Sequence, residues 1–153
     1  MNLSHKITVA APRAKVWEFL MDIPSVAKCG PGVQSVEPLG DDKYRGTINV
    51  AFGPVRLALA GDVSITEKDE AAKIASMRAE AADKRAGGAV KAVMKMSLVE
   101  TAGNAQSTEL TMDTDAQIMG RIGEFGQPII RKKAEQTMNE FAKNLEKAIA
   151  EGK

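Results

Sequence analysis

Cys29 is the only cysteine of the chain and the side chain with the greatest intrinsic reactivity. A metal site needs several ligands at suitable spacing, and a nucleophilic cysteine needs a base nearby and something that lowers its pKa. Here the adjacent charged residue is Lys28, and the only histidine, His5, lies far away in the sequence. We therefore expect no metal site and interpret Cys29 as a small buried side chain.

The three residues after Cys29 are Gly30, Pro31 and Gly32. They predict a type II turn, because proline suits the second position of that turn and glycine accepts the positive φ of the third. We expect this turn to close one end of an internal space, with Cys29 packed beneath it. A role of the loop as a gate stays open as an alternative.

Acidic residues do not indicate acid–base catalysis. Glu109, Asp113 and Asp115 alternate with apolar residues and should face solvent, while Glu100 and Glu124 lie near the ends of elements without an obvious partner. The sequence has no phosphate-binding loop, no nucleophile elbow and no cluster of metal ligands. We therefore expect a non-catalytic protein that needs no cofactor.

Alternating apolar and polar residues predict the strands that position these side chains. The alternation is clean in five runs, which are residues 3–9, 43–52, 55–66, 90–98 and 109–118. Residues 72–83 are rich in alanine, and we interpret them as a further strand because their neighbours are strands. Strands with one polar and one apolar face are typical of an antiparallel sheet.

Helical patterns follow the first strand and the last strand of this set. Pro12 begins one that reaches Met21, and a second short helix starts near Pro24. Residues 120–150 carry apolar side chains at spacings of three and four, which predicts a long helix of roughly 45 Å. The order predicts an α+β fold in which a curved antiparallel sheet wraps around a long C-terminal helix, with two short helices after the first strand.

The length of 153 residues indicates one domain, which we assign to residues 1–150, followed by a short tail at 151–153. A curved sheet around a helix often leaves a cavity between them. Met94, Met96 and Met112 lie on the inward face, either as plain core or as a pliable cavity wall. His5 is either a hydrogen-bonded core histidine or a polar contact for a ligand. The candidate ligand contacts are His5, Phe52, Leu57, Leu59, Met94, Met96, Met112, Ile118, Ile122, Phe125 and Ile129.

Three glycines, Gly120, Gly123 and Gly126, recur before Pro128. If the last helix begins at Gly120, Pro128 kinks it. If the regular helix begins near Gln127, the glycine segment is a mobile entrance. In both cases we expect irregular structure here, close to the mouth of the cavity, and these four residues join Cys29, Gly30, Pro31 and Gly32 as candidate gate residues.

The formal net charge of +1 argues against a nucleic-acid partner. The chain shows no run of about 18 apolar residues and no signal-peptide pattern, and a single cysteine fits a reducing compartment. We therefore expect a cytoplasmic protein. The basic run at 131–133 reads as a solvated helix face, with acidic phospholipid as an alternative contact, although Glu135, Glu140 and Glu146 dilute its charge.

Several short motifs together resemble the family of the carbon monoxide dehydrogenase G subunit, a START-like (SRPBCC) group with the helix-grip fold. They occur in the family's order along nearly the whole chain. These motifs are AKVWEFLMD, Cys29-Gly30-Pro31-Gly32, Phe52-Gly53-Pro54-Val55, Gly87-Gly88, Thr114-Asp115-Ala116-Gln117 and EFAKNLEKAI. The chain departs from the pattern at Gly30, where the family usually has isoleucine.

The resemblance implies an internal apolar cavity and an accessory role beside a molybdenum-containing carbon monoxide dehydrogenase or related hydroxylase. We expect a binding or carrier protein for a quinone or an isoprenoid-like lipid. The alternatives are a small enzyme of the polyketide cyclase type and a maturation or interaction factor for a metalloenzyme. Family members that anchor to membranes carry an extended tail, whereas this chain ends at Glu151-Gly152-Lys153, so we expect at most peripheral contact with the inner face of a membrane.

Overall fold

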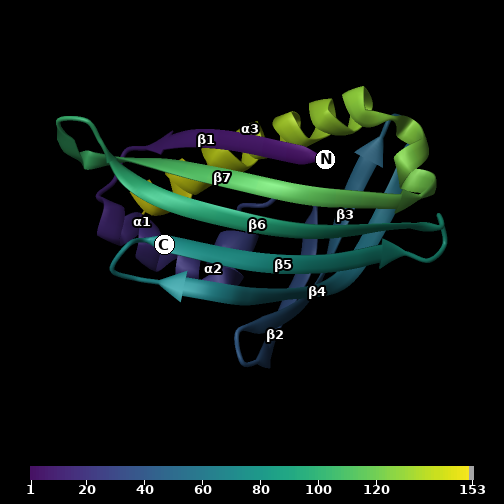
Figure 1. Ribbon diagram of the computed structural model, residues 1–153, viewed down its shortest axis with the longest axis horizontal. Helices are drawn as coiled ribbons and strands as arrows, with labels where there is room; N and C mark the ends of the chain where they lie inside the picture. The colour runs from purple at the N-terminus through teal and green to yellow at the C-terminus, as the bar shows by residue number, and fades with distance from the viewer. Residues whose placement is uncertain (152–153) are drawn as a thin grey trace.

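Seven antiparallel strands form one curved sheet in the order β1-β7-β6-β5-β4-β3-β2 (Figure 1). The computed structural model describes residues 1–151, so most of the predicted tail lies outside the described residues. The strands are β1 (Asn2–Val9), β2 (Val33–Gly40), β3 (Lys43–Phe52), β4 (Val55–Asp69), β5 (Ile74–Asp83), β6 (Gly88–Thr101) and β7 (Asn104–Gly120). The predicted α+β fold, with its curved antiparallel sheet, is confirmed.

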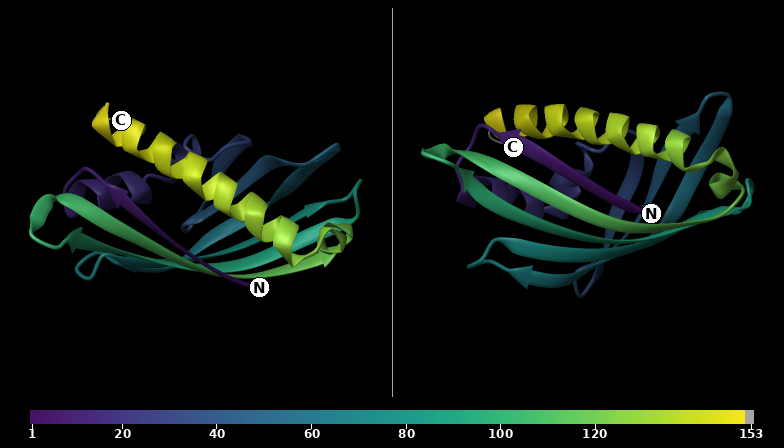
Figure 2. Two further views of the ribbon diagram at one scale, coloured as in Figure 1. Left: turned by 90° about the horizontal axis from the view of Figure 1, so that it is seen from above. Right: turned by 45° about the horizontal axis from the view of Figure 1, so that its top comes forward.

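The helices are α1 (Arg13–Met21), α2 (Ile23–Ala27), the 3-10 helix η1 (Arg121–Phe125) and α3 (Gln127–Ala150). Figure 2 shows α3 running along the concave side of the sheet. Its 24 residues span about 36 Å, less than the 45 Å expected, because Gly126 adopts φ 84° and separates η1 from α3. Pro128 lies in the first turn of α3, where backbone N–H groups have no acceptor within the helix, so the missing N–H of proline costs no helical hydrogen bond. The alternative in which the helix begins near Gln127 is therefore correct.

Strand β2 was not predicted from the sequence. It pairs only with β3, at the edge of the sheet, and its register shifts between Val33 and Ser35 and again between Pro38 and Gly40. Each shift moves the following side chains relative to the two faces, so the apolar residues lose their period of two. The alternation test fails on this strand for that reason.

The most deeply buried side chains lie where α1 and the last turns of α3 meet the sheet. Val9, Val16, Leu98, Leu110 and Leu145 each retain 1 % or less of their exposed surface. Together with their neighbours they form one contiguous hydrophobic core. This core fills the space beside α1, and it anchors the C-terminal half of α3 to the sheet.

Candidate ligand-binding cavity

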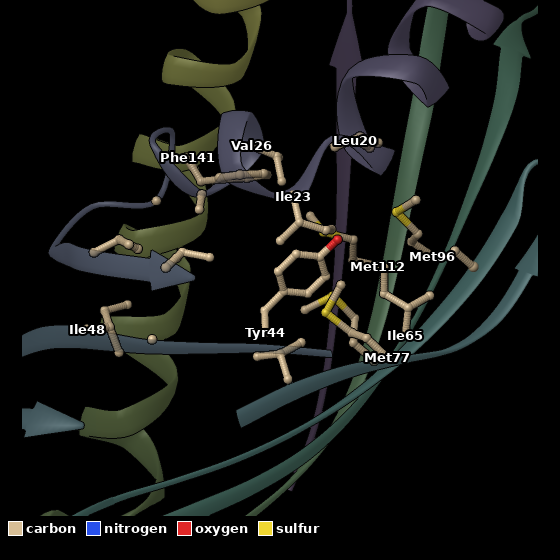
Figure 3. Close-up of a pocket in the computed structure, with 18 of the residues that line it drawn as sticks. Leu20, Ile23, Val26, Tyr44, Ile48, Ile65, Met77, Met96, Met112 and Phe141 are labelled. Carbon is tan, nitrogen blue, oxygen red and sulfur yellow. The ribbon is translucent and has the colours of Figure 1, made fainter. Parts of the chain in front are cut away.

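An apolar cavity of about 350 Å³ lies between the sheet, α2 and the middle of α3 (Figure 3). Its roof comes from helices, through Leu20, Met21, Ile23, Val26, Ala27, Thr137, Met138 and Phe141. Its floor and one wall come from strands, through Val33, Val36, Tyr44, Arg45, Gly46, Ile48, Val63, Ile65, Ala75, Ser76, Met77, Met94, Met96 and Met112. This volume falls in the usual range of small-molecule sites.

The strand register explains why the floor is apolar. Tyr44 pairs with Val63, and Met77 pairs with both Ile65 and Met94. Paired residues project to the same face of a sheet, so the inward positions of neighbouring strands form a continuous row. The alternation in sequence thus becomes an unbroken apolar surface beneath the helices.

The three predicted methionines, Met94, Met96 and Met112, all line this cavity. Met96 and Met112 also belong to the buried core, whereas Met94 is only half-buried. The two interpretations left open by the sequence are therefore both partly correct, since these side chains join core and cavity wall. Their unbranched thioethers, with that of Met77, can adapt to ligands of different shape.

The hydroxyl of Tyr44 projects into the cavity between Ile23, Met77 and Met112 (Figure 3). Among the described residues, none forms a hydrogen bond with this hydroxyl. The hydroxyl oxygen is not fully buried, so a molecule in the cavity can reach it. A ligand in the cavity could therefore accept a hydrogen bond from it or donate one to it.

The other polar side chains of the lining are mostly engaged elsewhere. Arg45 Nε donates to Asp62 Oδ1 at 2.9 Å on the outer face of the sheet, and this bond lowers the pKa of the Asp62 carboxyl. Ser76 Oγ donates to Glu67 Oε1 at 2.9 Å. Thr137 on α3 is the remaining hydroxyl of the lining. No histidine, lysine or carboxylate side chain lines the cavity within the described residues.

The predicted turn closes the cavity at one end, as Gly30 and Pro31 both line it. Gly32 adopts φ 84°, and a Cβ at this position would overlap the carbonyl oxygen of Asn49. The Asn49 N–H donates to the Gly32 carbonyl at 2.8 Å, which pins the turn to β3. Glycine is thus required here both by backbone conformation and by the close approach of a strand.

Cys29 is buried, as predicted, but it lies outside the lining of the apolar cavity. Burial raises the pKa of the Cys29 thiol, which disfavours the nucleophilic thiolate. Its carbonyl oxygen accepts a hydrogen bond from Asn144 Nδ2 at 2.9 Å. The segment around Cys29 therefore ties the turn after α2 to α3, which is a structural role. The described residues contain no group of ligands that could hold a metal ion.

The remaining predicted contact residues lie outside the lining, so their expected position is corrected. His5 is on the inner face opposite Met112 but does not reach the cavity. Seven other predicted contacts also lie outside the lining, either near the start of α3 or at other inner positions of the strands, and they are Phe52, Leu57, Leu59, Ile118, Ile122, Phe125 and Ile129. Of these, Ile129 faces solvent with 53 % of its surface exposed.

Phe52 and Phe125 stack with ring centroids 4.7 Å apart and fill the space at that end of the sheet. Ile122 is buried against Gly88. The glycine segment with Gly120, Gly123, Gly126 and Pro128 accordingly lies beside this filled cluster rather than at the cavity. The sequence prediction placed the mouth of the cavity at this glycine segment, and that position is wrong. The cavity lies beside α2 instead.

Sequence reasoning missed Tyr44 and the helical contributors Ile23, Val26, Met138 and Phe141. A signal for Tyr44 existed, since it is the only tyrosine and stands at an inward position of an alternating run. The apolar stripe of residues 120–150 includes Met138 and Phe141 and indicates the buried face of that helix. It does not show which residues of the stripe border a cavity and which join the core, because that depends on how the helices dock.

A family model described as the carbon monoxide dehydrogenase G subunit, CoxG, matches residues 6–150. The chain belongs to the CoxG family. Among curated proteins, no match to this CoxG family member was found. Within the described residues, no helix is long and apolar enough to cross a membrane.

Solved structures share the fold of this CoxG family member. A conserved protein from Geobacillus kaustophilus has a TM-score of 0.88 at 24% identity, with 99% of this chain and 96% of that chain covered. A START superfamily protein from Mycobacterium smegmatis has a TM-score of 0.74 at 15% identity, covering 99% of both chains. The Zhui aromatase/cyclase from Streptomyces sp. R1128 has a TM-score of 0.69 at 17% identity, covering 98% and 93%. The predicted START-like helix-grip fold is thus confirmed.

Proposed function

We propose that the protein is a non-catalytic binding or carrier protein for a hydrophobic small molecule held in the cavity. The observation that carries this proposal is an apolar cavity of about 350 Å³ that is lined by Tyr44. Among the described residues, none forms a hydrogen bond with the Tyr44 hydroxyl. Such a site favours a ligand that is apolar over most of its surface and carries one oxygen acceptor or donor. A quinone or an isoprenoid-like lipid with a carbonyl or hydroxyl end has this chemistry.

Membership in the CoxG family supports an accessory role beside a molybdenum-containing carbon monoxide dehydrogenase-type enzyme. The structural likeness to an aromatase/cyclase makes a cyclase-like enzyme the second candidate. General acid–base catalysis needs positioned titratable groups in the pocket, and the described lining offers Tyr44 and an Arg45 that is paired with Asp62. This composition favours binding over catalysis.

The proposal is tested by mass spectrometry of organic extracts from the purified protein, followed by titration of the ligand-free protein with a short-chain quinone. We expect a stoichiometric hydrophobic molecule in the extract, or saturable quinone binding that quenches the fluorescence of the single tryptophan or is seen by calorimetry. A protein that is empty and also fails to take up quinones would contradict the carrier function. Turnover of an added polyketide would favour the cyclase instead.

Replacing Tyr44 by phenylalanine tests how the ligand is oriented. The substitution keeps the ring and removes only the hydroxyl, so quinone affinity should fall roughly 3- to 10-fold, the effect of one lost hydrogen bond. A hydrocarbon isoprenoid without oxygen should bind the variant and the wild type equally well. If both ligands lose affinity to the same degree, Tyr44 acts through packing and not through its hydroxyl. The measurement is a calorimetric titration of each ligand against both proteins.

A further inference from the structure

The Tyr44 hydroxyl gives the cavity a direction (Figure 3). It points toward the side of Met96 and Met112, whereas Ile48 and Phe141 lie on the other side of the Tyr44 ring. A ligand whose oxygen bonds to this hydroxyl therefore extends its apolar part through the cavity toward Ile48. The residues around Ile48 decide how long that apolar part can be.

The turn between α2 and β2 forms the wall at the Ile48 end. Val33, the first residue of β2, pairs with Ile48 of β3. Gly30 and Pro31 of the turn stand just before Val33, and both line the cavity. This pairing places Gly30 at the end of the cavity that lies away from the Tyr44 hydroxyl.

Backbone conformation does not require glycine at position 30. Gly30 lacks the positive φ of Gly32, and a residue before proline favours extended backbone, which every residue type can adopt. Gly46, which also lines the cavity, is glycine for a packing reason, because a Cβ there would lie 2.6 Å from the Ser35 carbonyl oxygen of the adjacent strand. No strand backbone approaches Gly30 in this way.

A side chain at position 30 would take up space at the cavity. A Cβ on Gly30 would lie 2.9 Å from Val33 Cγ2 and 3.3 Å from the Ala27 carbonyl oxygen. Val33 and Ala27 both line the cavity, so this Cβ would stand among lining atoms. The closest of them is a methyl group, which can turn away by rotation of the Val33 side chain. We therefore expect the fold to accept a small side chain here, at the expense of room beside Ile48.

We propose that Gly30 is a specificity-determining residue, which lets the cavity take amphiphiles with long apolar chains. The oxygen of such a ligand bonds to Tyr44, and the distal part of its chain occupies the room beside Gly30. A larger residue at this position would leave room only for shorter chains. The inference rests on the proposed function of the cavity and adds selection by chain length to it.

The test is calorimetric titration of the purified protein with straight-chain primary alcohols from hexanol to dodecanol. Each alcohol carries one hydroxyl for Tyr44, and the series differs only in chain length. For the wild type we expect the affinity to rise roughly fourfold with each added methylene, which is the effect of burying one CH₂ group.

Gly30→Val should remove this gain for the long chains alone. Hexanol should bind the variant as it binds the wild type, whereas dodecanol should bind roughly tenfold or more weakly, because about two methylenes lose their place. Gly30→Ala should produce a smaller loss with the same dependence on chain length, and it serves as the test if the valine variant does not fold. Tyr44→Phe should instead weaken all the alcohols by one common factor.

Gly123→Val is the matched control. Gly123 also lacks a positive φ, lies in η1 outside the cavity lining, and would place a Cβ no closer than 3.5 Å to the Ile118 carbonyl oxygen. This variant should leave every affinity unchanged. Circular dichroism and thermal melting show whether each variant is folded.

The outcomes separate a failure of this inference from a failure of the carrier function. If Gly30→Val binds every alcohol as the wild type does, or loses affinity for hexanol and dodecanol by the same factor, Gly30 does not select chain length, while the carrier function stands. Wild-type protein that binds no alcohol and no quinone would contradict the carrier function, and the role of Gly30 with it.

Discussion

Tryptophan in place of Val63 should abolish most ligand binding without unfolding the protein. Val63 lies on the cavity floor, paired with Tyr44, and it points into open space rather than into packed core. An indole there would displace a ligand from about 100 Å² of apolar contact, which corresponds to roughly 2.5 kcal/mol or about a 70-fold loss of affinity. Because the new side chain fills an existing cavity, we expect the melting temperature to stay the same or rise.

The matched control for this variant is Val93→Trp. Val93 is also a valine in the sheet, but it is 47 % exposed on the outer face of β6. It should leave quinone titrations unchanged. If Val63→Trp binds ligand as the wild type does, the ligand does not occupy this cavity, and the assignment of the site is wrong.

Alanine in place of Leu145 should lower the free energy of unfolding by roughly 2–5 kcal/mol, the range found when a buried leucine is truncated and leaves a cavity. Leu145 of α3 is fully buried in the same core as Val16, Leu98 and Leu110. It fastens the C-terminal half of the helix to the sheet. Urea denaturation of both proteins measures the difference.

The neighbouring substitution Glu146→Ala is the control for Leu145→Ala. Glu146 is exposed on the same helix, so its loss should change the free energy of unfolding by less than about 0.5 kcal/mol. Phe141, one turn before Leu145, lines the cavity. A loosened helix should therefore also weaken ligand binding. Equal stabilities of the two variants would show that α3 is not held by this core.

Binding and stability thus rest on different parts of the same helix. Leu145 and Ile149 lie in the core beside α1, whereas Met138 and Phe141 face the cavity. Large side chains fill the first region. The second region is the cavity, which α2 and the middle of α3 cover. This division allows substitutions in the cavity to be read as effects on the ligand.

The sequence by itself determined which face of most strands is buried. Met94, Met96 and Met112 stand at alternate positions, and period-2 alternation reports a face directly because successive side chains point to opposite sides. It also predicted the long helix, the turn at Pro31 and Gly32, and the structural burial of Cys29. It could not detect β2, whose register shifts destroy the alternation.

The tertiary structure alone decided where along the inner face the cavity lies. Phe52 and Leu57 share that face with Ile48 and Val63, yet only the latter two line the cavity. Alternation carries no information on which stretch of a long strand the helices cover, because that depends on docking between residues far apart in the chain.

The distribution of charge shows the same limit. The run at 131–133 is diluted by glutamates in the sequence, and it becomes part of a strongly positive end only because antiparallel pairing brings Lys84, Arg85 and Arg121 beside it. Local patterns determine the faces of elements, and long-range contacts determine which faces and charges meet.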